Sequence, residues 1–446
     1  MSPRRARRAG PAPLSVMTVV GTRPELIKMS RVIAAFDRHT RHTLVHTGQN
    51  FDDGLNGVFF RQLEIREPDH FLNVADRTAA QTIANVIART DDLLAKVRPD
   101  AFVVYGDTNS CLSAIAAKRR RIPVFHLEAG NRCFDDRVPE EVNRRIIDHL
   151  SDINMPLTEH ARTYLLREGL RPETVLKIGS TMREVLEYYR AGIEASDALQ
   201  RLKLEPRRYF VVSAHREENV DDPARLSALV SALSDLARRY RRRIIVSTHP
   251  RSRKRLTALF RSSGRAGASA LEFLPPFGFF EWIKLQTEAF CVVSDSGTLS
   301  EESALLGFPA VMIREAHERP EGMEAGATIM AGLSAARIEQ AVEVATSRPG
   351  GVEVRVRTGN DVHRGELAHA ARRRGARVGG GLDGRDVAAH DGRDVAGPDL
   401  FPADQRDLGR LDHRVCRFDH RDETLRFDHP EGFTHYCLLQ WLSRMA

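Results

Sequence analysis

Acidic residues stand at three points of this chain where short apolar runs give way to polar turns or helices. Asp107 follows the run 101–105, Glu128 follows the run 123–127, and Glu140 stands in the first turn of a predicted helix. Carboxylates confined to one site push their pKa values apart, which divides acid and base roles between them. Helix capping by Asp107 and dipole matching by Glu140 are the structural alternative. The joint occurrence of all three favours general acid–base catalysis.

Positive charge is supplied by GTRPELIK, residues 21–28, which directly follows the first predicted strand. Gly21 permits a tight turn, and Arg23 and Lys28 place cations where the next helix opens, an arrangement that suits a phosphate or diphosphate. A surface loop with a capped helix is the alternative. The segment matches neither GxGxxG nor GxxxxGK[ST], so neither a dinucleotide fingerprint nor a Walker loop is indicated.

The second half of the chain carries a further set of candidates. His215 follows a predicted strand and can donate to a phosphate or leaving-group oxygen, although histidines at strand ends are more often structural. Ser296 and Gly297 stand where a predicted helix begins, which is a potential anion site, and Glu302 lies further along the same helix. Arg319 supplies a cation near this edge; surface charge is the alternative interpretation.

The elements that must position these residues alternate regularly from residue 16 to about 345. Short β-branched runs alternate with amphipathic segments, which predicts βαβ units and parallel sheets with helices on both faces. Twelve strands are predicted, at 16–20, 43–47, 101–105, 123–127, 153–157, 175–179, 209–214, 243–248, 271–274, 290–294, 309–313 and 327–331. Twelve are too many for one doubly wound sheet. We therefore expect an α/β protein with two Rossmann-like domains, whose strand ends face each other across a cleft.

Predicted boundaries follow from this pattern. Residues 1–14 are a basic leader without an apolar core and are expected to be disordered, 15–180 form the N-terminal domain, and 181–346 form the C-terminal domain, which is expected to bind a nucleotide. Residues 347–446 lose the hydrophobic periodicity and are rich in Arg, Asp, Gly and His, so we expect a disordered, low-complexity tail. Its Asp-His pairs have no convincing ligand spacing, and no metal site is predicted.

Composition excludes several classes of protein. Of 446 residues, 42% are hydrophobic and 28% charged, which is typical of a globular protein, and no uncharged apolar stretch is long enough to span a membrane. The net charge of +7 is modest, so nucleic-acid binding is not expected. Five scattered cysteines indicate no disulfide framework and favour a reducing cytoplasm.

Eight segments, taken in order, resemble one known family. GTRPELIK, TGQN, GDTNS, HLEAGNR, PEEVNRR, SAHREEN, DSGTLSEE and ERPEG occur between about residues 15 and 345. Together they closely resemble the non-hydrolysing UDP-N-acetylglucosamine 2-epimerases. The resemblance implies the glycosyltransferase-B arrangement of two Rossmann-like domains, a homodimer, and no cofactor or metal. It also implies that the enzyme eliminates UDP to a 2-acetamidoglycal and then adds UDP back.

The resemblance assigns roles to individual residues. It implies catalytic roles for the carboxylates Asp107, Glu128 and Glu140, and contacts to the diphosphate or leaving group for Lys28, His215 and Arg319. It also implies four positions at the UDP site: Arg23, Ser296, Gly297 and Glu302. We further expect the aromatic side chain of Trp282 to lie beside the uracil.

The wording of several motifs points to one branch of the family. GDTNSC, AGNRCFD and AHERPEGMEA are similar to enzymes that convert UDP-2-acetamido-2,6-dideoxy-L-talose to UDP-N-acetyl-L-fucosamine for capsule and O-antigen. Three alternatives remain open: a UDP-N-acetylglucosamine/UDP-N-acetylmannosamine 2-epimerase, a glycosyltransferase of the same architecture, and an inactive nucleotide-sugar-binding remnant. Proton exchange at C2 distinguishes an epimerase from a transferase.

Overall fold

The computed structural model describes residues 13–49, 53–214, 222–248, 270–314, 328–347, 416–419 and 424–427. Contacts divide the chain into one unit formed by Met1–Val356 with Thr434–Ala446, and a second unit, Arg357–Phe433. The predicted leader falls almost entirely outside the described residues, and so does most of the predicted tail. No helix in the described ranges is long and apolar enough to cross a membrane.

The first sheet has the strand order β3-β2-β1-β4-β5-β6, and its pairs are parallel. The runs are nearly continuous in apolar residues because both faces of the sheet are covered, and all six residues of the first strand are buried. Its strands are β1 (Ser15–Val20), β2 (Arg41–His46), β3 (His70–Phe71), β4 (Ala101–Tyr105), β5 (Val124–Leu127) and β6 (Ile153–Met155).

The second sheet repeats this plan with the order β12-β11-β10-β7-β8-β9, again with parallel pairs. In each sheet the strand order reverses between its first and fourth strands, which are β1 and β4, then β7 and β10. Its strands are β7 (Tyr209–Ser213), β8 (Arg243–Ser247), β9 (Leu271–Leu274), β10 (Cys291–Ser294), β11 (Ala310–Met312) and β12 (Thr328–Met330). The predicted fold class, α/β with two Rossmann-like parallel sheets, is confirmed.

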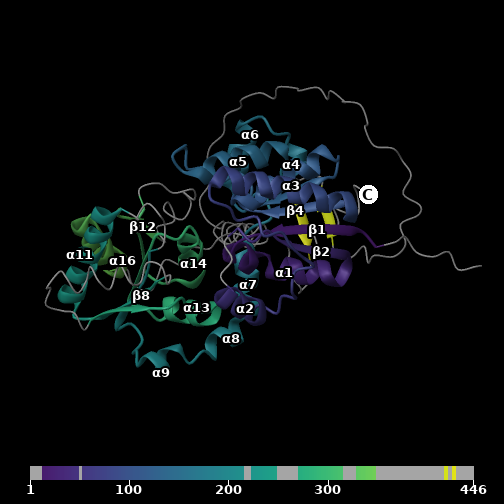
Figure 1. Ribbon diagram of the computed structural model, residues 1–446. Coiled ribbons are helices and arrows are strands. Elements are labelled where there is room, and N and C mark those ends of the chain that lie inside the picture. The colour runs from purple at the N-terminus through teal and green to yellow at the C-terminus, as the bar shows by residue number, and fades with distance from the viewer. Residues whose placement is uncertain are drawn as a thin grey trace, which may run out of the picture. The chain divides into compact units, whose positions relative to one another are not determined.

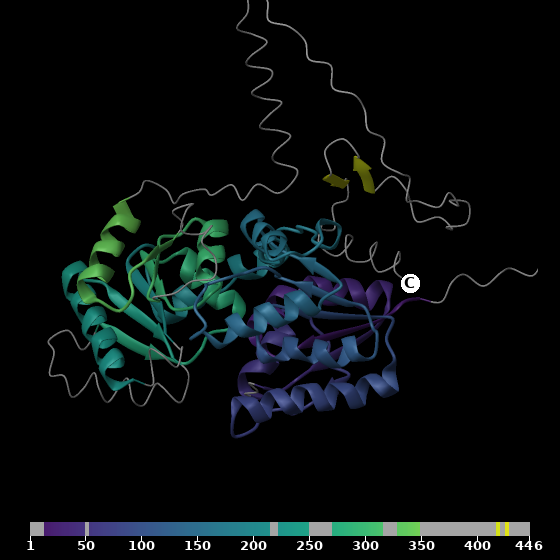
Figure 2. The same cartoon turned by 90° about the horizontal axis from the view of Figure 1, so that it is seen from above.

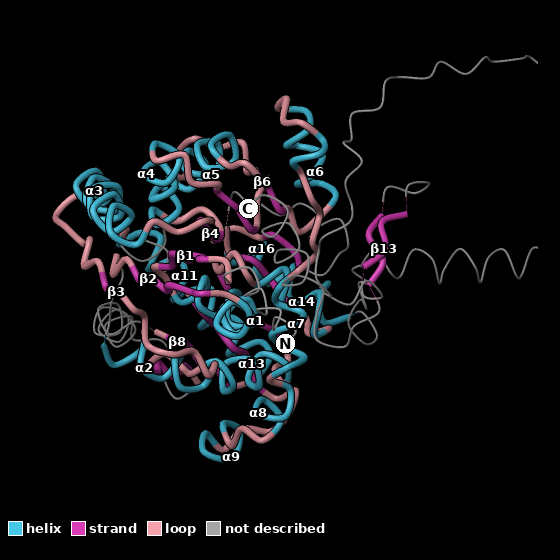
Figure 3. The backbone as a smooth tube through the Cα atoms, turned by 90° about the vertical axis from the view of Figure 1, so that its right-hand side faces the viewer, coloured by secondary structure: helices cyan, strands magenta, loops and turns pink. Residues whose placement is uncertain are grey.

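Helices cover both faces of each sheet. On the first sheet, α3, α4 and α5 lie side by side on one face, and α1, α2 and α7 lie on the other (Figures 1 and 3). The helices are α1 (Arg23–His39), α2 (Asp53–Gln62), α3 (Ala79–Val97), α4 (Ala114–Arg119), α5 (Pro139–Leu150), α6 (Glu159–Arg167), α7 (Thr181–Tyr188), α8 (Arg190–Glu194), α9 (Ala198–Leu202), α11 (Pro223–Tyr240), α13 (Phe279–Thr287), α14 (Leu299–Leu306) and α16 (Ala335–Ser347), with 3-10 turns η1 (Asn109–Ser113) and η2 (Pro172–Thr174).

Helix boundaries follow local chemistry. Helix α3 begins after Thr78, whose hydroxyl accepts a hydrogen bond from the N–H of Gln81, and it ends at Arg98 in the left-handed conformation. Helix α7 buries Met182, Val185 and Leu186 in the same apolar cluster as the first sheet. The segment that follows the predicted domain boundary at residue 180 is therefore anchored on the N-terminal core.

One predicted strand, 175–179, is wrong. Only Val175 forms a bridge, to Asn154, although Leu176 and Ile178 donate backbone hydrogen bonds to Asn154 and Pro156. Proline has no N–H, so the ladder along β6 cannot be completed on that side.

A hairpin lies within the predicted disordered tail. Strands β13 (Cys416–Asp419) and β14 (Thr424–Phe427) pair antiparallel, and Figure 2 shows them as two short arrows. Each strand contains one copy of the repeated RFDH sequence in part, and the register sets Phe418 opposite Leu425 and Cys416 opposite Phe427. The rest of the tail lies outside the described residues, and its disorder stays a prediction.

Candidate active site

The candidate site lies at the carboxyl ends of β1, β4 and β5, where the order of the first sheet reverses. Ligands of open α/β sheets bind at such a point. Gly21 follows β1 in contact with two hydroxyls: a Cβ built on it would lie 2.0 Å from Ser110 Oγ and 2.2 Å from Thr47 Oγ1. Only glycine allows the backbone to pass there.

Lys28 and Glu128 meet directly at this edge. Lys28 Nζ lies 2.9 Å and 3.1 Å from the two carboxylate oxygens of Glu128, and 3.4 Å from Glu301 Oε2. The Lys28 side chain is 4% exposed and that of Glu128 11%. Glu128 has a φ of +67°, a left-handed conformation that is uncommon for a residue other than glycine and typical of functional sites.

Asp107 follows β4 and is held by helix α5. Arg144 Nε donates to Asp107 Oδ2 at 2.7 Å, and Asn143 Nδ2 donates to the Asp107 backbone carbonyl at 2.9 Å. Asp107 and Glu128 stand on neighbouring strands, since Gly106 N–H donates to the carbonyl of Leu127. A Cβ built on Gly106 would lie 3.6 Å from Glu128 Oε2. The structure therefore brings the predicted Asp107, Glu128 and Lys28 together.

The two adjacent glutamates at the start of α5 have different surroundings. Glu140 is half-buried, and in the described ranges its carboxylate makes no hydrogen bond or ion pair. Glu141 is fully buried and accepts from Cys133 N–H, Phe134 N–H and Arg144 Nη1. Burial alone would raise the pKa of Glu141, but these hydrogen bonds and the Arg144 charge lower it. Glu141 thus orients Arg144, which leaves Glu140 as the candidate that can face a substrate.

Glu25 is a site residue that the sequence analysis missed. Its Oε2 accepts from Gly21 N–H at 2.5 Å and from Thr22 N–H at 3.2 Å, and its Oε1 accepts from the Thr108 hydroxyl. Burial raises its pKa to about 7, against the opposing effect of these hydrogen bonds. The sequence indicates Glu25 only as the third residue of α1, a position where a glutamate carboxylate commonly accepts a hydrogen bond from the N-cap backbone N–H. That signal does not show that the carboxyl is buried beside Thr108.

On the second sheet, Ser296 and Gly297 lie between β10 and the start of α14, as predicted. Ser296 N–H donates to Ser294 Oγ at 3.0 Å, and the hydroxyls of Ser296 and Thr298 are 3.0 Å apart. Glu302 is buried and accepts from Gln286 Nε2 at 2.8 Å. Burial raises the pKa of Glu302. The neighbouring Glu301, not among the predictions, accepts from Ser180 Oγ and pairs with Lys28.

The remaining predicted residues are placed as follows. The Arg23 guanidinium carbon lies 5.6 Å from the ring centroid of Phe59. Trp282 is half-buried, and its ring is nearly parallel to that of Phe277, with centroids 6.3 Å apart. His215 and Arg319 lie outside the described residues. No cluster of three or more metal-ligating side chains occurs in the described ranges.

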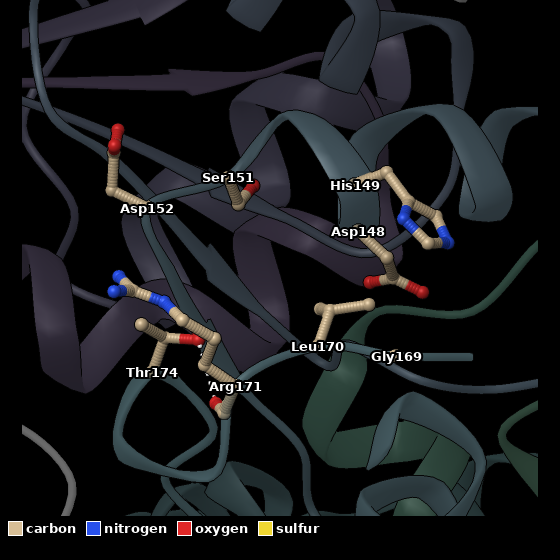
Figure 4. Close-up of a pocket in the computed structure, with 8 residues that line it drawn as sticks. All are labelled: Asp148, His149, Ser151, Asp152, Gly169, Leu170, Arg171 and Thr174. Carbon is tan, nitrogen blue, oxygen red and sulfur yellow. Dashed lines mark hydrogen bonds between the residues drawn. The ribbon is translucent and has the colours of Figure 1, made fainter. Parts of the chain in front are cut away.

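A separate hollow of about 240 Å³ lies where β6 begins, away from the strand ends that carry these residues (Figure 4). None of the predicted site residues lines it. Its lining residues are Asp148, His149, Ser151, Asp152, Gly169, Leu170, Arg171 and Thr174.

Comparison with known proteins places this geometry in a family. The model of the family described as UDP-N-acetylglucosamine 2-epimerase matches residues 34–361. A solved structure of UDP-N-acetylglucosamine 2-epimerase from Rickettsia bellii is 50% identical, with a TM-score of 0.70 over 81% of this chain and 95% of that chain.

Two further proteins are similar over most of their length. The Methanocaldococcus jannaschii UDP-GlcNAc 2-epimerase, solved in complex with UDP-GlcNAc and UDP, is 30% identical, with a TM-score of 0.72 over 80% of this chain and 99% of that chain. The UDP-2,3-diacetamido-2,3-dideoxy-D-glucuronate 2-epimerase of Pseudomonas aeruginosa is 32% identical over 72% of this chain and 89% of its own. The chain therefore belongs to the UDP-N-acetylglucosamine 2-epimerase family.

Proposed function

We propose that this protein inverts C2 of a UDP-linked 2-acetamido sugar by eliminating UDP and adding it back. The observation that carries the proposal is the ion pair between Lys28 and Glu128 beside Asp107, at the switch point of the first sheet. A C2 proton is weakly acidic, so its removal needs a carboxylate base close by. Cations at the diphosphate stabilise the departing oxygen.

The bond changes balance without a cofactor. A carboxylate takes the C2 proton, the C2–H electron pair forms the C1–C2 double bond of a glycal, and the C1–O pair leaves with UDP. Re-addition of UDP to C1 and protonation of C2 on the opposite face give the epimer. Because the proton leaves one face and returns on the other, two acid/base groups are needed. We assign these roles to the group Asp107, Glu128 and Glu140, with Lys28, His215 and Arg319 on the diphosphate.

We assign the UDP moiety to the second sheet. Ser296 and Gly297 precede α14, and Glu302 is a buried carboxylate in the first turn of that helix. A carboxylate there can accept both hydroxyls of a ribose. The relative from M. jannaschii, solved with UDP-GlcNAc and UDP, supports a site of this kind.

Incubation with UDP-N-acetylglucosamine, followed by NMR of the sugar C1 and C2 protons, tests the proposal. A mixture of the two C2 epimers, reached from either one, is expected. Transfer of the sugar to an acceptor without epimer formation would instead support the glycosyltransferase alternative. No turnover of any UDP-2-acetamido sugar by folded protein would support an inactive binding remnant.

A finer proposal concerns the sugar. We propose that the preferred substrate is the 6-deoxy compound UDP-2-acetamido-2,6-dideoxy-L-talose. The support for this preference is the sequence of three motifs alone, GDTNSC, AGNRCFD and AHERPEGMEA. A site built for a methyl group at C6 leaves an added hydroxyl poorly paired, so kcat/KM should differ by roughly 10–200-fold. Equal or better kcat/KM on UDP-N-acetylglucosamine would overturn this preference and leave the C2 epimerase proposal standing.

We also propose that the enzyme acts as a homodimer. The support is the family assignment alone. Light scattering of the purified protein measures its mass directly, and a mass near the 50.0 kDa of one chain would contradict the proposal.

A further inference from the structure

A buried network of titratable side chains contacts the turns that carry Asp107 and Glu128, and the proposed mechanism does not use it. His126 on β5 and Asp148 on α5 are 1% and 0% exposed at their side chains, and Arg132 is 0% exposed. Burying several charged groups costs free energy unless they are paired and hydrogen-bonded. Every one of these three is paired, so the arrangement is a built feature of the fold.

Both ring nitrogens of His126 face acceptors. Nδ1 lies 2.8 Å from Asp148 Oδ1, and Nε2 lies 2.8 Å from the backbone carbonyl of Gly106. A backbone carbonyl only accepts, so Nε2 carries a proton. The ring is therefore held between Asp148 of α5 and the backbone carbonyl of Gly106.

Asp148 is held in place by further hydrogen-bond donors. Its carboxylate also accepts from Arg132 Nη1 at 2.7 Å and from Gly130 N–H at 3.2 Å and 3.3 Å. Burial alone would raise the pKa of Asp148, but His126 and Arg132 together lower it. His126 thus lies between the Asp148 carboxylate and the Gly106 carbonyl, and Asp148 is itself fixed by Arg132 and by the N–H of Gly130. Arg132 in turn pairs with Glu168.

The network touches both turns that carry the proposed carboxylates. Gly106, whose carbonyl receives the bond from His126, directly precedes Asp107. Glu128 is two residues after His126, and Gly130 N–H, on the same turn as Glu128, donates to Asp148. The pair His126–Asp148 therefore links the backbone of the two turns.

We propose that His126 is a positioning residue: its ring, anchored on Asp148, donates from Nε2 to the Gly106 carbonyl and fixes the turn that carries Asp107 relative to Glu128. This inference rests on the proposed function. His126 touches no substrate in this role. Its contribution is to keep the two carboxylates in register, because a misplacement of about 1 Å can cost on the order of 10²-fold in rate.

Two substitutions separate the two bonds of the ring. The amide nitrogen of glutamine reaches the position of Nε2 and can keep the donation to Gly106, whereas that of asparagine reaches the position of Nδ1 and keeps only the donation to Asp148. We expect His126→Asn to lower kcat by roughly 10-fold to 10²-fold with KM little changed. His126→Gln should recover most of that loss. The exposed His39 at the end of α1 provides the control, His39→Asn, with kcat as in the wild type.

Rates are compared per folded protein, measured by near-UV circular dichroism at the assay temperature. Wild-type kcat in both variants, or equal losses in both, would overturn the positioning role. A wild-type protein that does not epimerise at all refutes the proposed function instead, which keeps the two failures apart. If neither variant folds, NMR of the wild type labelled with 15N-histidine decides: Nε2 of His126 should carry a proton that is hydrogen-bonded to a backbone carbonyl. An unprotonated Nε2 would overturn the inference.

Discussion

Asp107 and Glu128 pair with different cations, Arg144 and Lys28, so each carboxylate is held in place independently of the other. We expect Asp107→Asn and Glu128→Gln each to lower kcat by on the order of 10²-fold or more, the usual scale for losing a general acid or base. Steady-state kinetics of epimer formation measures this. The exposed Glu173, changed to glutamine, is the matched control. Near wild-type rates in both site variants would contradict the assignment.

Glu25 makes stability depend on pH. Its pKa is raised from 4.5 to about 7 by burial, so the folded state binds this proton more tightly than the unfolded state. Stability from this group is therefore present at low pH and is lost as pH rises from about 4.5 to about 7, by on the order of 3 kcal/mol. Glu25→Gln keeps a neutral side chain and should remove this loss.

Urea unfolding at pH 5 and pH 8 checks this prediction. The free energy of unfolding of Glu25→Gln minus that of wild type should be larger at pH 8 than at pH 5, which means that the variant gains stability relative to wild type as pH rises. Glu187→Gln, at an exposed position on α7, should show no such change. Parallel pH profiles of wild type and Glu25→Gln would contradict the account of Glu25.

At the residue scale, the sequence identified side chains that end strands but not those that hold them. Asp107, Glu128 and Lys28 stand in turns whose position follows from the strand pattern. Arg144 and His126 act through contacts with segments 37 and 20 residues away in the chain. No local periodicity carries that information, because it depends on how β4, β5 and α5 pack.

At the scale of elements, helix α14 links the two proposed half-sites. Its Glu302 bonds Gln286 of α13, while Glu301 pairs with Lys28 of α1. We expect Glu302→Ala to weaken UDP binding by roughly 1–3 kcal/mol, the cost of a lost polar contact in a buried site. Calorimetry measures the affinity, and Glu339→Ala on α16 is the control. Unchanged UDP affinity of Glu302→Ala would refute the placement of the ribose.

The element pattern was predictable where strands are long and buried on both faces. Strands β1, β4 and β7 appear at the predicted positions, to within a residue, because their apolar pattern is strong. The strand at 175–179 fails because Pro156, directly after its neighbour β6, has no N–H for a ladder hydrogen bond. Strand β3, with two residues, is too short to leave a pattern, and β13 and β14 pair through a repeat that was read as low complexity.

At the scale of the whole molecule, the region after α16 is predicted to be dispensable for catalysis. Its composition buries too little apolar surface to offset roughly 1–2 kcal/mol of backbone entropy per ordered residue. A chain truncated after Gly350 should keep its activity and its melting temperature. A deletion of 357–433 that retains the apolar segment 436–442 is the matched comparison. A lower melting temperature in the truncation alone would show that the segment 436–442 supports the core.

The central claim is that C2 loses and regains a proton while UDP leaves and returns. Turnover in deuterated water, followed by NMR and mass spectrometry of the product, tests it most directly. The account predicts one solvent deuterium at C2 of the epimerised sugar, and loss of this exchange in Asp107→Asn and Glu128→Gln. An epimerised product that retains the original C2 proton would contradict it.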